Sequence, residues 1–462
     1  MIPTTIRRSG PALAVLAALP ATALASSFQI LEQSPSRLGT AFSGTASQAD
    51  DATTVFFNPA GMSRLEGKRL TVGGNAIVVN SEFDDEGSTA GVGTTLQGPL
   101  PGTEDETDEP GLVPNLYYVQ PINDRWTFGV GVNAPFGLAS DYDDDWQGRY
   151  HATESELQTI NINPTFAFAV TDRLSLGFGL SYQHSDVTLE NEVDSFNACL
   201  PAAQQSSGLS ESAATGTCAA AHGGPANRSA DSSVEIEGDD DDIVADLSLH
   251  WQATDRTAIG VTWRQGGDFK LEGDADFSAS TSCAQDPFCS GGLAALDGDI
   301  EAEAEFPDTV TLSATHAYRN GLTVHADVAW TDWSVLQSIP IENTDSGRTV
   351  NELELEYDDT VRVALGATWN TDSPWTWRGG IAHDESPQTG AEYITPRIPD
   401  ADRTWLSGGF NYAFRSGLSI DVGYTHLFVD DVSINTVEQG NRLRGDFEAS
   451  VDLLAVQANW RF

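Results

Sequence analysis

The sequence predicts an all-β protein, a 14-stranded antiparallel transmembrane β-barrel with an N-terminal hatch, or plug, in its lumen. Three observations predict it. Apolar and polar residues alternate with period two along most of the chain, short turns alternate with long polar loops, and aromatic residues fall at the ends of the alternating segments. No run of about 18 apolar residues follows the first 25 positions, which excludes a helical membrane protein.

Residues 1–25 are predicted to be a secretory signal peptide. Arg7 and Arg8 give a positive start, and residues 12–24 form a short apolar stretch. Residues 23–25, Ala-Leu-Ala, have the small-x-small pattern of a signal peptidase site. We therefore expect an exported protein whose mature chain begins at Ser26.

The segment 26–67 is predicted to be the hatch. It lacks alternation and is rich in glycine, alanine and serine. A barrel of this size has a lumen too wide for its wall side chains to fill, so a compact segment folded inside would close it. Within it, Asn58, Pro59 and Ala60 have the character of turn residues that lock the hatch fold. The alternative is an ordered periplasmic tail.

Residues 68–462 are predicted to form the barrel. In 174–182, for example, leucine and aromatic residues alternate with glycine and serine, as expected for a strand with unlike environments on its two faces. Exposed aromatic girdles are expected at Trp126, Trp330, Trp369 and Trp460. The predicted strands lie near 68–81, 112–122, 126–140, 154–170, 174–192, 233–253, 257–278, 300–318, 322–339, 352–370, 375–385, 403–414, 418–431 and 447–462.

The last strand ends on Phe462, which suits the closing strand of a barrel and its recognition by the barrel-assembly machinery. Long polar loops are expected at 193–232, 279–299, 386–402 and 432–446. Because these loops alternate with very short turns, the layout is that of an outer-membrane barrel rather than a soluble sandwich.

The chain carries 68 acidic and 23 basic residues, a formal net charge of −45. Such a chain does not bind nucleic acid through phosphate neutralisation, and its acid-rich, lysine-poor balance favours a salty habitat. The acidic runs 143–145 and 239–242 do not match an EF-hand, and solvated loop faces explain them more simply than calcium sites. We expect no cofactor and no metal.

The four cysteines form two local pairs, and an even number in an exported chain predicts the disulfides Cys199–Cys218 and Cys283–Cys289. Their spacings do not match a zinc site.

Several short motifs give the sequence a family resemblance. They comprise Leu38 to Gly44, Asp50 to Ala52, Asn58 to Ala60, Asn133 to Leu138, Phe306 to Asp308, Trp330 to Ser334, Ile381 to Pro387 and Ile398 to Arg403. In this order, with this strand layout, the mature chain resembles the FadL-type outer-membrane transporters of long-chain fatty acids and aromatic hydrocarbons. The resemblance implies substrate capture among extracellular loops, binding in the lumen near the hatch, and sideways exit through a gap at a kinked strand.

The kink is expected at Asn133, Pro135 and Gly137. Proline cannot donate a ladder hydrogen bond, so a bulge at Pro135 would open the wall locally, unless Pro135 merely ends its strand early.

Phe28 and Phe136 are expected to contact the substrate, although Phe28 is also compatible with a purely hydrophobic anchor. A carboxylate in an apolar pocket needs a cationic partner. The candidates are Arg264, Arg362 and Arg378, because the family's carboxylate recognition does not carry over residue by residue.

The sequence therefore predicts a monomeric protein, embedded in outer-membrane lipid, that transports hydrophobic molecules and above all long-chain fatty acids. The alternative on the same scaffold is uptake of aromatic or aliphatic hydrocarbons. An outer-membrane lipid hydrolase is disfavoured because no G-x-S-x-G or H-E-x-x-H pattern occurs, so we expect no enzyme. A general porin is disfavoured because the hatch would obstruct its lumen.

Overall fold

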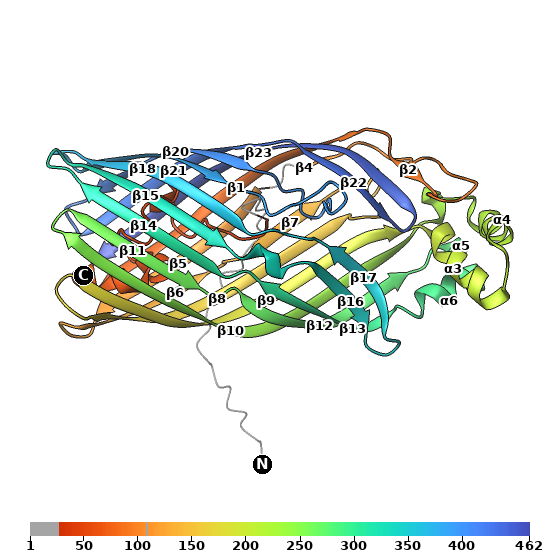
Figure 1. Cartoon of the computed structure of the whole chain (residues 1–462), viewed down its shortest axis with the longest axis horizontal. Coiled ribbons are helices and arrows are strands. Elements are labelled where there is room, and N and C mark those ends of the chain that lie inside the picture. Colours follow the sequence, from red (N-terminus) through yellow and green to blue (C-terminus); the bar gives the residue numbers. More distant parts are fainter. Residues whose placement is uncertain (1–26, 108–109) are drawn as a thin grey trace, which may run out of the picture.

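A computed structural model describes residues 27–107 and 110–462, so the predicted signal peptide 1–25 lies outside the described residues. The chain forms a closed antiparallel barrel in which β1 (Arg69–Asp85) pairs with β23 (Asn441–Arg461), from Arg69 opposite Arg461 to Asp85 opposite Gly445 (Figure 1). The predicted 14-stranded antiparallel barrel is confirmed. Among the described residues, no helix has the length and apolarity to cross a membrane.

Several wall strands are interrupted part-way, so two shorter strands follow one another along the same line. The strands between β1 and β23 are β5 (Pro110–Pro121), β6 (Trp126–Asn133) with β7 (Gly137–Asp141), β8 (Glu154–Ala169), β9 (Leu174–Val193), β10 (Ser232–Thr254), β11 (Thr257–Arg264) with β12 (Gly267–Ser278), β13 (Gly298–Phe306) with β14 (Thr309–Ala317), β15 (Leu322–Thr331) with β16 (Ser338–Asn343), β17 (Arg348–Glu354) with β18 (Thr360–Asn370), β19 (Trp375–Asp384), β20 (Arg403–Ala413), and β21 (Leu418–Val429) with β22 (Val432–Glu438). Three two-residue strands, β2 (Thr89–Ala90), β3 (Gly98–Pro99) and β4 (Glu106–Thr107), lie in the connection after β1.

The outer wall carries the predicted aromatic residues. Trp126, Trp330, Trp369 and Trp460 are between 37% and 53% exposed although they are large and apolar. A surface of exposed apolar side chains is stable when lipid covers it. The girdle prediction is therefore consistent with the wall that the structure shows.

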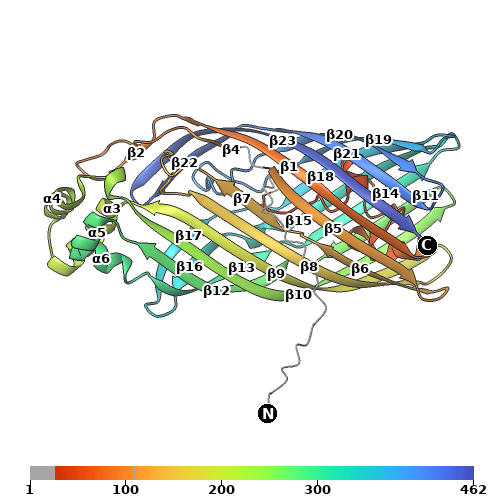
Figure 2. The same ribbon diagram turned by 180° about the vertical axis from the view of Figure 1, so that it is seen from behind.

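Four helices gather at one end of the barrel, opposite the end where the C-terminus lies (Figures 1 and 2). They are α3 (Ser195–Ser207), α4 (Glu211–His222), α5 (Thr281–Gln285) and α6 (Pro287–Leu293), and short 3-10 turns occur at η2 (Arg228–Ala230) and η3 (Trp333–Val335). The segments 193–232 and 279–299 were expected to be polar loops only. Three of these helices, α3, α5 and α6, begin at side-chain caps, because Asp194, Ser280 and Asp286 accept hydrogen bonds from the first-turn amides.

Both predicted disulfides are present in this helical cap. Cys199 on α3 bonds to Cys218 on α4, and Cys283 on α5 bonds to Cys289 on α6. All four cysteines are fully buried in one apolar cluster with Phe196.

The prediction of a long loop at 432–446 is wrong. Here β22 and the start of β23 form a tight hairpin, from Val432 opposite Phe447 to Glu438 opposite Asn441. Its two turn residues, Gln439 and Gly440, both have positive φ, which matches the twist of a two-residue hairpin. Glutamine rarely takes this conformation, so the turn left no Asn-Gly or Asp-Gly signal in the sequence.

The segment from Ser27 to Gly67 lies inside the barrel, with α1 (Pro35–Leu38), α2 (Thr54–Phe57) and η1 (Pro59–Arg64) as its only regular elements among the described residues (Figure 1). The wall makes room for it at glycines. A Cβ on Gly260 would come 1.7 Å from the Ala46 carbonyl oxygen, and one on Gly380 would come 2.3 Å from the Thr40 carbonyl. These wall positions therefore accept no side chain while the hatch is in place.

Inward-facing polar side chains hold the hatch by its backbone. Asp327 on β15 accepts hydrogen bonds from the Gly44 amide and, at 3.0 Å, from the Thr45 amide. The Ser248 hydroxyl on β10 accepts a hydrogen bond from the backbone amide of Ala60 at 3.0 Å. The side-chain Nδ2 of Asn58 donates to the Leu249 carbonyl at 3.0 Å. The Asn58-Pro59-Ala60 motif thus joins the hatch to β10.

We expect Asp327→Ala to loosen the hatch without unfolding the barrel. The change leaves the Gly44 and Thr45 amides without their acceptor. Each buried unsatisfied group costs about 1–3 kcal/mol of stability. Ion conductance across planar bilayers should rise above that of the parent protein. Asp327→Asn, which keeps one acceptor oxygen, is the matched control and should leak less; equal, low conductance in all three proteins would contradict this role.

Removing the longer disulfide should destabilise the helical cap and spare the barrel. The Cys199–Cys218 ring spans 19 residues, for which chain entropy predicts a loss of about 3 kcal/mol. In Cys199→Ala/Cys218→Ala, limited proteolysis should cut within 193–232 faster, while the heat-dependent gel shift of the barrel stays at the parent temperature. A shifted barrel transition would show that the cap and the wall unfold together.

Candidate functional site

The wall is interrupted at the predicted kink. β6 pairs with β8 as far as Asn133 opposite Asn161, and β7 resumes at Gly137 opposite Gln158. The three residues 134–136 therefore lie opposite the two residues of β8 between Gln158 and Asn161, which is the register of a β-bulge. On the other side, β5 pairs with β6 only up to Leu116 opposite Val132, and no β5–β7 ladder occurs among the described strands.

The backbone groups released at the bulge bind the hatch. The Pro135 carbonyl accepts from the Ile30 amide at 2.8 Å, and the Gly137 amide donates to the Phe28 carbonyl at 2.9 Å. Gln29 and Phe136 form the antiparallel bridge between these two bonds. The start of the hatch is thus paired, strand to strand, with the bulge in the wall.

Gln33 and Thr159 complete this junction. The Gln33 side chain donates to the Ala134 carbonyl at 2.5 Å and accepts from the Ala134 amide at 3.4 Å. Thr159 Oγ1 accepts from the Phe136 amide at 3.0 Å and donates to the Phe136 carbonyl at 2.6 Å. Every residue of the bulge is therefore hydrogen-bonded, as backbone within a membrane wall must be.

Phe28 fills an aromatic box in the lumen next to the bulge. Its ring centroid lies 4.9 Å from that of Trp333, 5.2 Å from Phe306 and 6.0 Å from Phe136. Only 4% of Phe28 is exposed. The structure thus brings together Phe28 and Phe136, which the sequence proposed as substrate contacts, with Phe28 occupying apolar space that a hydrophobic ligand would need.

A small cavity lies beside this box, between hatch and wall. Its volume is about 90 Å³, below the range of about 300–1,000 Å³ found for ligand pockets. Ile30, Phe42, Phe56 and Phe57 of the hatch line it, together with Pro135, Phe136, Arg264, Arg362, Asp327 and Asp384 of the wall. The cavity is therefore a lumen pocket that is nearly closed by the hatch.

The two arginines of the lumen pocket have different partners. Arg264 donates to the Phe56 carbonyl and stacks 3.8 Å from the Phe56 ring centroid, and no carboxylate lies within 4.0 Å of it among the described residues. Arg362 donates to the Ala41 carbonyl at 2.9 Å and lies 3.7 Å from Asp384. Among the described residues, Arg264 thus forms no ion pair, and its acidic neighbour is Asp246, which lies directly opposite it on β10.

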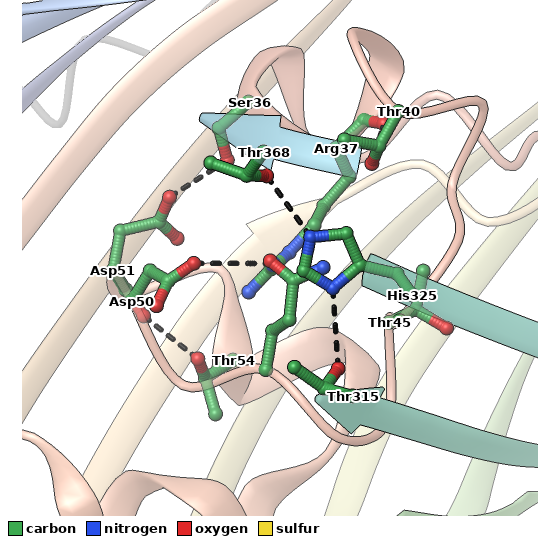
Figure 3. Close-up of polar contacts among 12 residues, drawn as sticks. Ser36, Arg37, Thr40, Thr45, Asp50, Asp51, Thr54, Thr315, His325 and Thr368 are labelled. Carbon is green, nitrogen blue, oxygen red and sulfur yellow. Dashed lines mark hydrogen bonds and ion pairs between the residues drawn. The ribbon is translucent and has the colours of Figure 1, made fainter. Parts of the chain in front are cut away.

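Arg378, the third candidate, lies outside the lumen pocket. It pairs with Asp421 at 2.5 Å and lines a vestibule of about 590 Å³ on the far side of the hatch. Figure 3 shows polar contacts at the base of the hatch, where the wall residue His325 lies 3.2 Å from Thr315 and 3.0 Å from Thr368. This polar base closes the lumen toward the C-terminal end of the barrel.

A larger apolar groove opens among the helices of the cap. Its volume is about 580 Å³, within the usual range for ligand pockets. Val193, Val234, Ile236, Phe277, Leu293 and Val350 provide much of its lining. We call it the capture groove; α3, α6 and the strand ends around them form it. The groove is open, whereas the lumen pocket of the same structure is nearly closed.

Apolar side chains connect the groove with the aromatic box. Val187, Ile339 and Leu353 pack both against the cap cluster around Phe196 and against the cluster that contains Phe28 and Trp333. An apolar track therefore runs from the capture groove down the inner wall to the hatch.

Sequence reasoning missed Gln33, Trp333 and the groove, because alternation reports which face a residue occupies and not what it meets across the lumen.

The comparisons with known proteins agree with this geometry. The family model described as outer membrane protein transport protein (OMPP1/FadL/TodX) matches residues 16–462. Outer membrane protein P1 of Haemophilus influenzae is 32% identical, covering 87% of this chain and 86% of its own. The long-chain fatty acid transport protein of Escherichia coli is 28% identical, covering 98% of each chain.

Solved structures show the same fold. A FadL homologue from Pseudomonas aeruginosa superposes with a TM-score of 0.81 at 23% identity, covering 94% of this chain and 100% of that one. The toluene transporter TodX of Pseudomonas putida gives a TM-score of 0.68 at 18% identity, covering 94% and 99%. The chain therefore belongs to the FadL/TodX family of outer-membrane proteins, which transport hydrophobic molecules.

Proposed function

We propose that this protein takes up long-chain fatty acids across the outer membrane. The substrate enters the capture groove, follows the apolar track, binds in the lumen pocket with its carboxylate at Arg264, and leaves sideways at the bulge. The observation that carries the proposal is the continuous apolar path that ends beside Arg264, which has no carboxylate within 4.0 Å among the described residues. The name of the Escherichia coli relative supports the same substrate class.

The lumen pocket must enlarge before a fatty acid can bind. At about 90 Å³ it does not admit an acyl chain, whereas the capture groove at about 580 Å³ does. Phe28 fills the apolar space beside the pocket, and only van der Waals and ring contacts hold its side chain there. An acyl chain gains about 0.8 kcal/mol for each buried CH₂ and can therefore displace the phenyl ring.

Displacing Phe28 acts directly on the wall. The Phe28 carbonyl holds the Gly137 amide, so movement of Phe28 breaks one of the bonds that join the hatch to the bulge. The substrate then lies beside the one stretch of β6–β7 that lacks a β5 partner. Sideways exit keeps the acyl chain in contact with lipid instead of crossing the polar hatch base, so apolar transfer favours this route.

Arg264 is the proposed carboxylate partner. A guanidinium binds a carboxylate through two parallel hydrogen bonds, and burial away from water strengthens them. Arg362 is less suitable because Asp384 and the Ala41 carbonyl already occupy it.

Uptake of hydrocarbons is the second candidate. The observation that favours it is the lining of the capture groove, which contains no lysine, arginine or histidine among its residues. A neutral hydrocarbon would need no cation at either stage.

Uptake of labelled oleate and labelled toluene should separate the two candidates. In a transport-deficient bacterium that expresses this chain, we expect saturable oleate uptake. Arg264→Gln should lower it about tenfold or more, because a charge-assisted bond to a carboxylate contributes about 1.5–3 kcal/mol. Arg264→Lys, which keeps the charge, should restore part of the rate. Toluene uptake without oleate uptake would establish the hydrocarbon channel instead. If correctly inserted protein took up neither oleate nor toluene, the transport proposal would be refuted.

Locking the hatch to the bulge should stop transport. Gln29 and Phe136 are directly paired, and antiparallel partners have Cα separations within the range that a disulfide spans. In Gln29→Cys/Phe136→Cys we expect the oxidised form to lose oleate uptake at least about tenfold relative to its reduced form. Each single variant and the parent, treated with the same reductant, provide the controls. Equal uptake by the oxidised and reduced forms would mean that the substrate leaves without moving the start of the hatch.

A further inference from the structure

The capture groove and the lumen pocket have opposite charge. The only charged residues in the lining of the groove are Glu352 on β17 and Glu438 on β22. Glu352 is exposed, and Glu438 lies 3.6 Å from the Nδ1 atom of His151. The lumen pocket, in contrast, contains the guanidinium of Arg264, which forms no ion pair with its cross-strand neighbour Asp246.

The amides that line the groove are largely occupied by the protein itself. The Asn197 side chain donates to Asp194 at 2.6 Å, and the Asn191 side chain accepts from Arg397 at 3.0 Å. The Gln439 side chain donates to the carbonyls of Tyr150 and Glu192. A carboxylate in the groove would therefore lose its hydration without gaining charged or amide donors, which is strongly unfavourable.

The surroundings of the groove add negative potential. Five outward-facing carboxylates lie directly opposite one another on five neighbouring strands: Asp186 on β9, Asp239 on β10, Glu272 on β12, Glu301 on β13 and Glu342 on β16. Like charges in direct cross-strand contact repel one another. Lys270, at 2.7 Å from Glu301, is the one lysine near this row.

Glu192 extends this field to the edge of the groove. It lies between Asn191 and Val193, which both line the groove. Burial, together with the charges of Asp231 and Asp144, outweighs the opposing charges of Arg149 and Arg228 and raises the pKa of the Glu192 carboxyl to about 7. The direction of the shift reflects an environment that already disfavours one more negative charge.

We propose that the capture groove selects against anionic head groups, so that a fatty acid enters it as the uncharged acid and ionises only beside Arg264. The inference rests on the proposed transport function and adds the protonation state of the substrate at each stage. An apolar, acid-lined groove raises the pKa of a bound carboxylic acid and so retains its proton. The guanidinium of Arg264 reverses that preference, and the proton passes to water in the lumen.

Three ligands with the same twelve-carbon chain test the charge preference: dodecylammonium, dodecanol and dodecanoate. Purified full-length protein in a non-ionic amphipol at about pH 8 would bind the uncharged dye Nile red, and each ligand would displace it. A carboxylic acid has a pKa of about 4–5 in water, so dodecanoate is ionised at this pH. Binding that persists in Val350→Trp, in which the groove is filled, is subtracted as binding elsewhere.

We expect dodecylammonium and dodecanol to bind at least about tenfold more tightly than dodecanoate, the difference that one unit charge at close range produces in a partly buried site. Glu352→Lys places a cation at the groove and should lower the ratio of the dodecanoate Kd to the dodecylammonium Kd several-fold. Asp124→Lys, in an exposed turn at the opposite end of the barrel, changes the net charge equally and should leave the ratio unchanged.

The outcomes separate the inference from the proposed function. Dodecanoate that binds as tightly as dodecylammonium would overturn the charge preference while leaving transport intact. A ratio that falls equally in Glu352→Lys and Asp124→Lys would also overturn it, because the effect would then come from net charge. Failure of all three ligands to displace Nile red would refute capture at the groove, and with it the transport path on which the inference rests.

Discussion

The structure depends on one constraint, that every backbone amide and carbonyl in a membrane wall must have a hydrogen-bond partner. Pro135 lacks an amide hydrogen and so cannot continue the ladder of β6 into β7. The bulge that results turns the Pro135 carbonyl and the Gly137 amide toward the lumen. The hatch satisfies both groups with its own backbone, so the gap in the wall and the start of the hatch are one hydrogen-bonded unit.

The position of the rest of the hatch follows from that junction. With residues 28–33 fixed at the bulge, the remaining chain crosses the lumen at the level of Gly260 and Gly380, where the wall has no side chains. Polar side chains such as Asp327 and Ser248 then meet its backbone. Apolar residues on the other side of the same segment, above all Phe28, face the substrate path. One short segment therefore closes the lumen through polar contacts with the wall on one side and presents an apolar surface to the proposed substrate path on the other.

Alternation predicted the strands well, because a strand between lipid and lumen has unlike environments on its two faces, and the layout of loops and turns then distinguished a barrel from a sandwich. It predicts an inward-facing position for Arg362 and leaves Arg264 and Arg378 as further candidates. In the structure, all three reach interior partners: the Phe56 carbonyl, the Ala41 carbonyl and Asp421. Alternation did not give their depth along the barrel axis, and depth separates Arg378, beside Asp421 in the vestibule, from Arg264 in the lumen pocket. The role of Gln33 was equally out of reach, since its partner Ala134 lies 101 residues away and is contacted through backbone atoms that carry no sequence signal.

The charge distribution gives the path a direction. The capture groove and the strand ends around it are acidic, whereas the lumen pocket holds the guanidinium of Arg264, which forms no ion pair with its cross-strand neighbour Asp246. On the proposed path, an ionised fatty acid would be repelled at the first stage and stabilised at the second. The electrostatic free energy of the head group would then fall along the same line on which the apolar track guides the tail. In the mechanism we propose, the acyl chain occupies the aromatic box only after Phe28 leaves it. Because Phe28 also holds the Gly137 amide, arrival of the substrate would weaken the wall. The mechanism we propose would use the free energy of substrate burial to displace the group that keeps the wall closed.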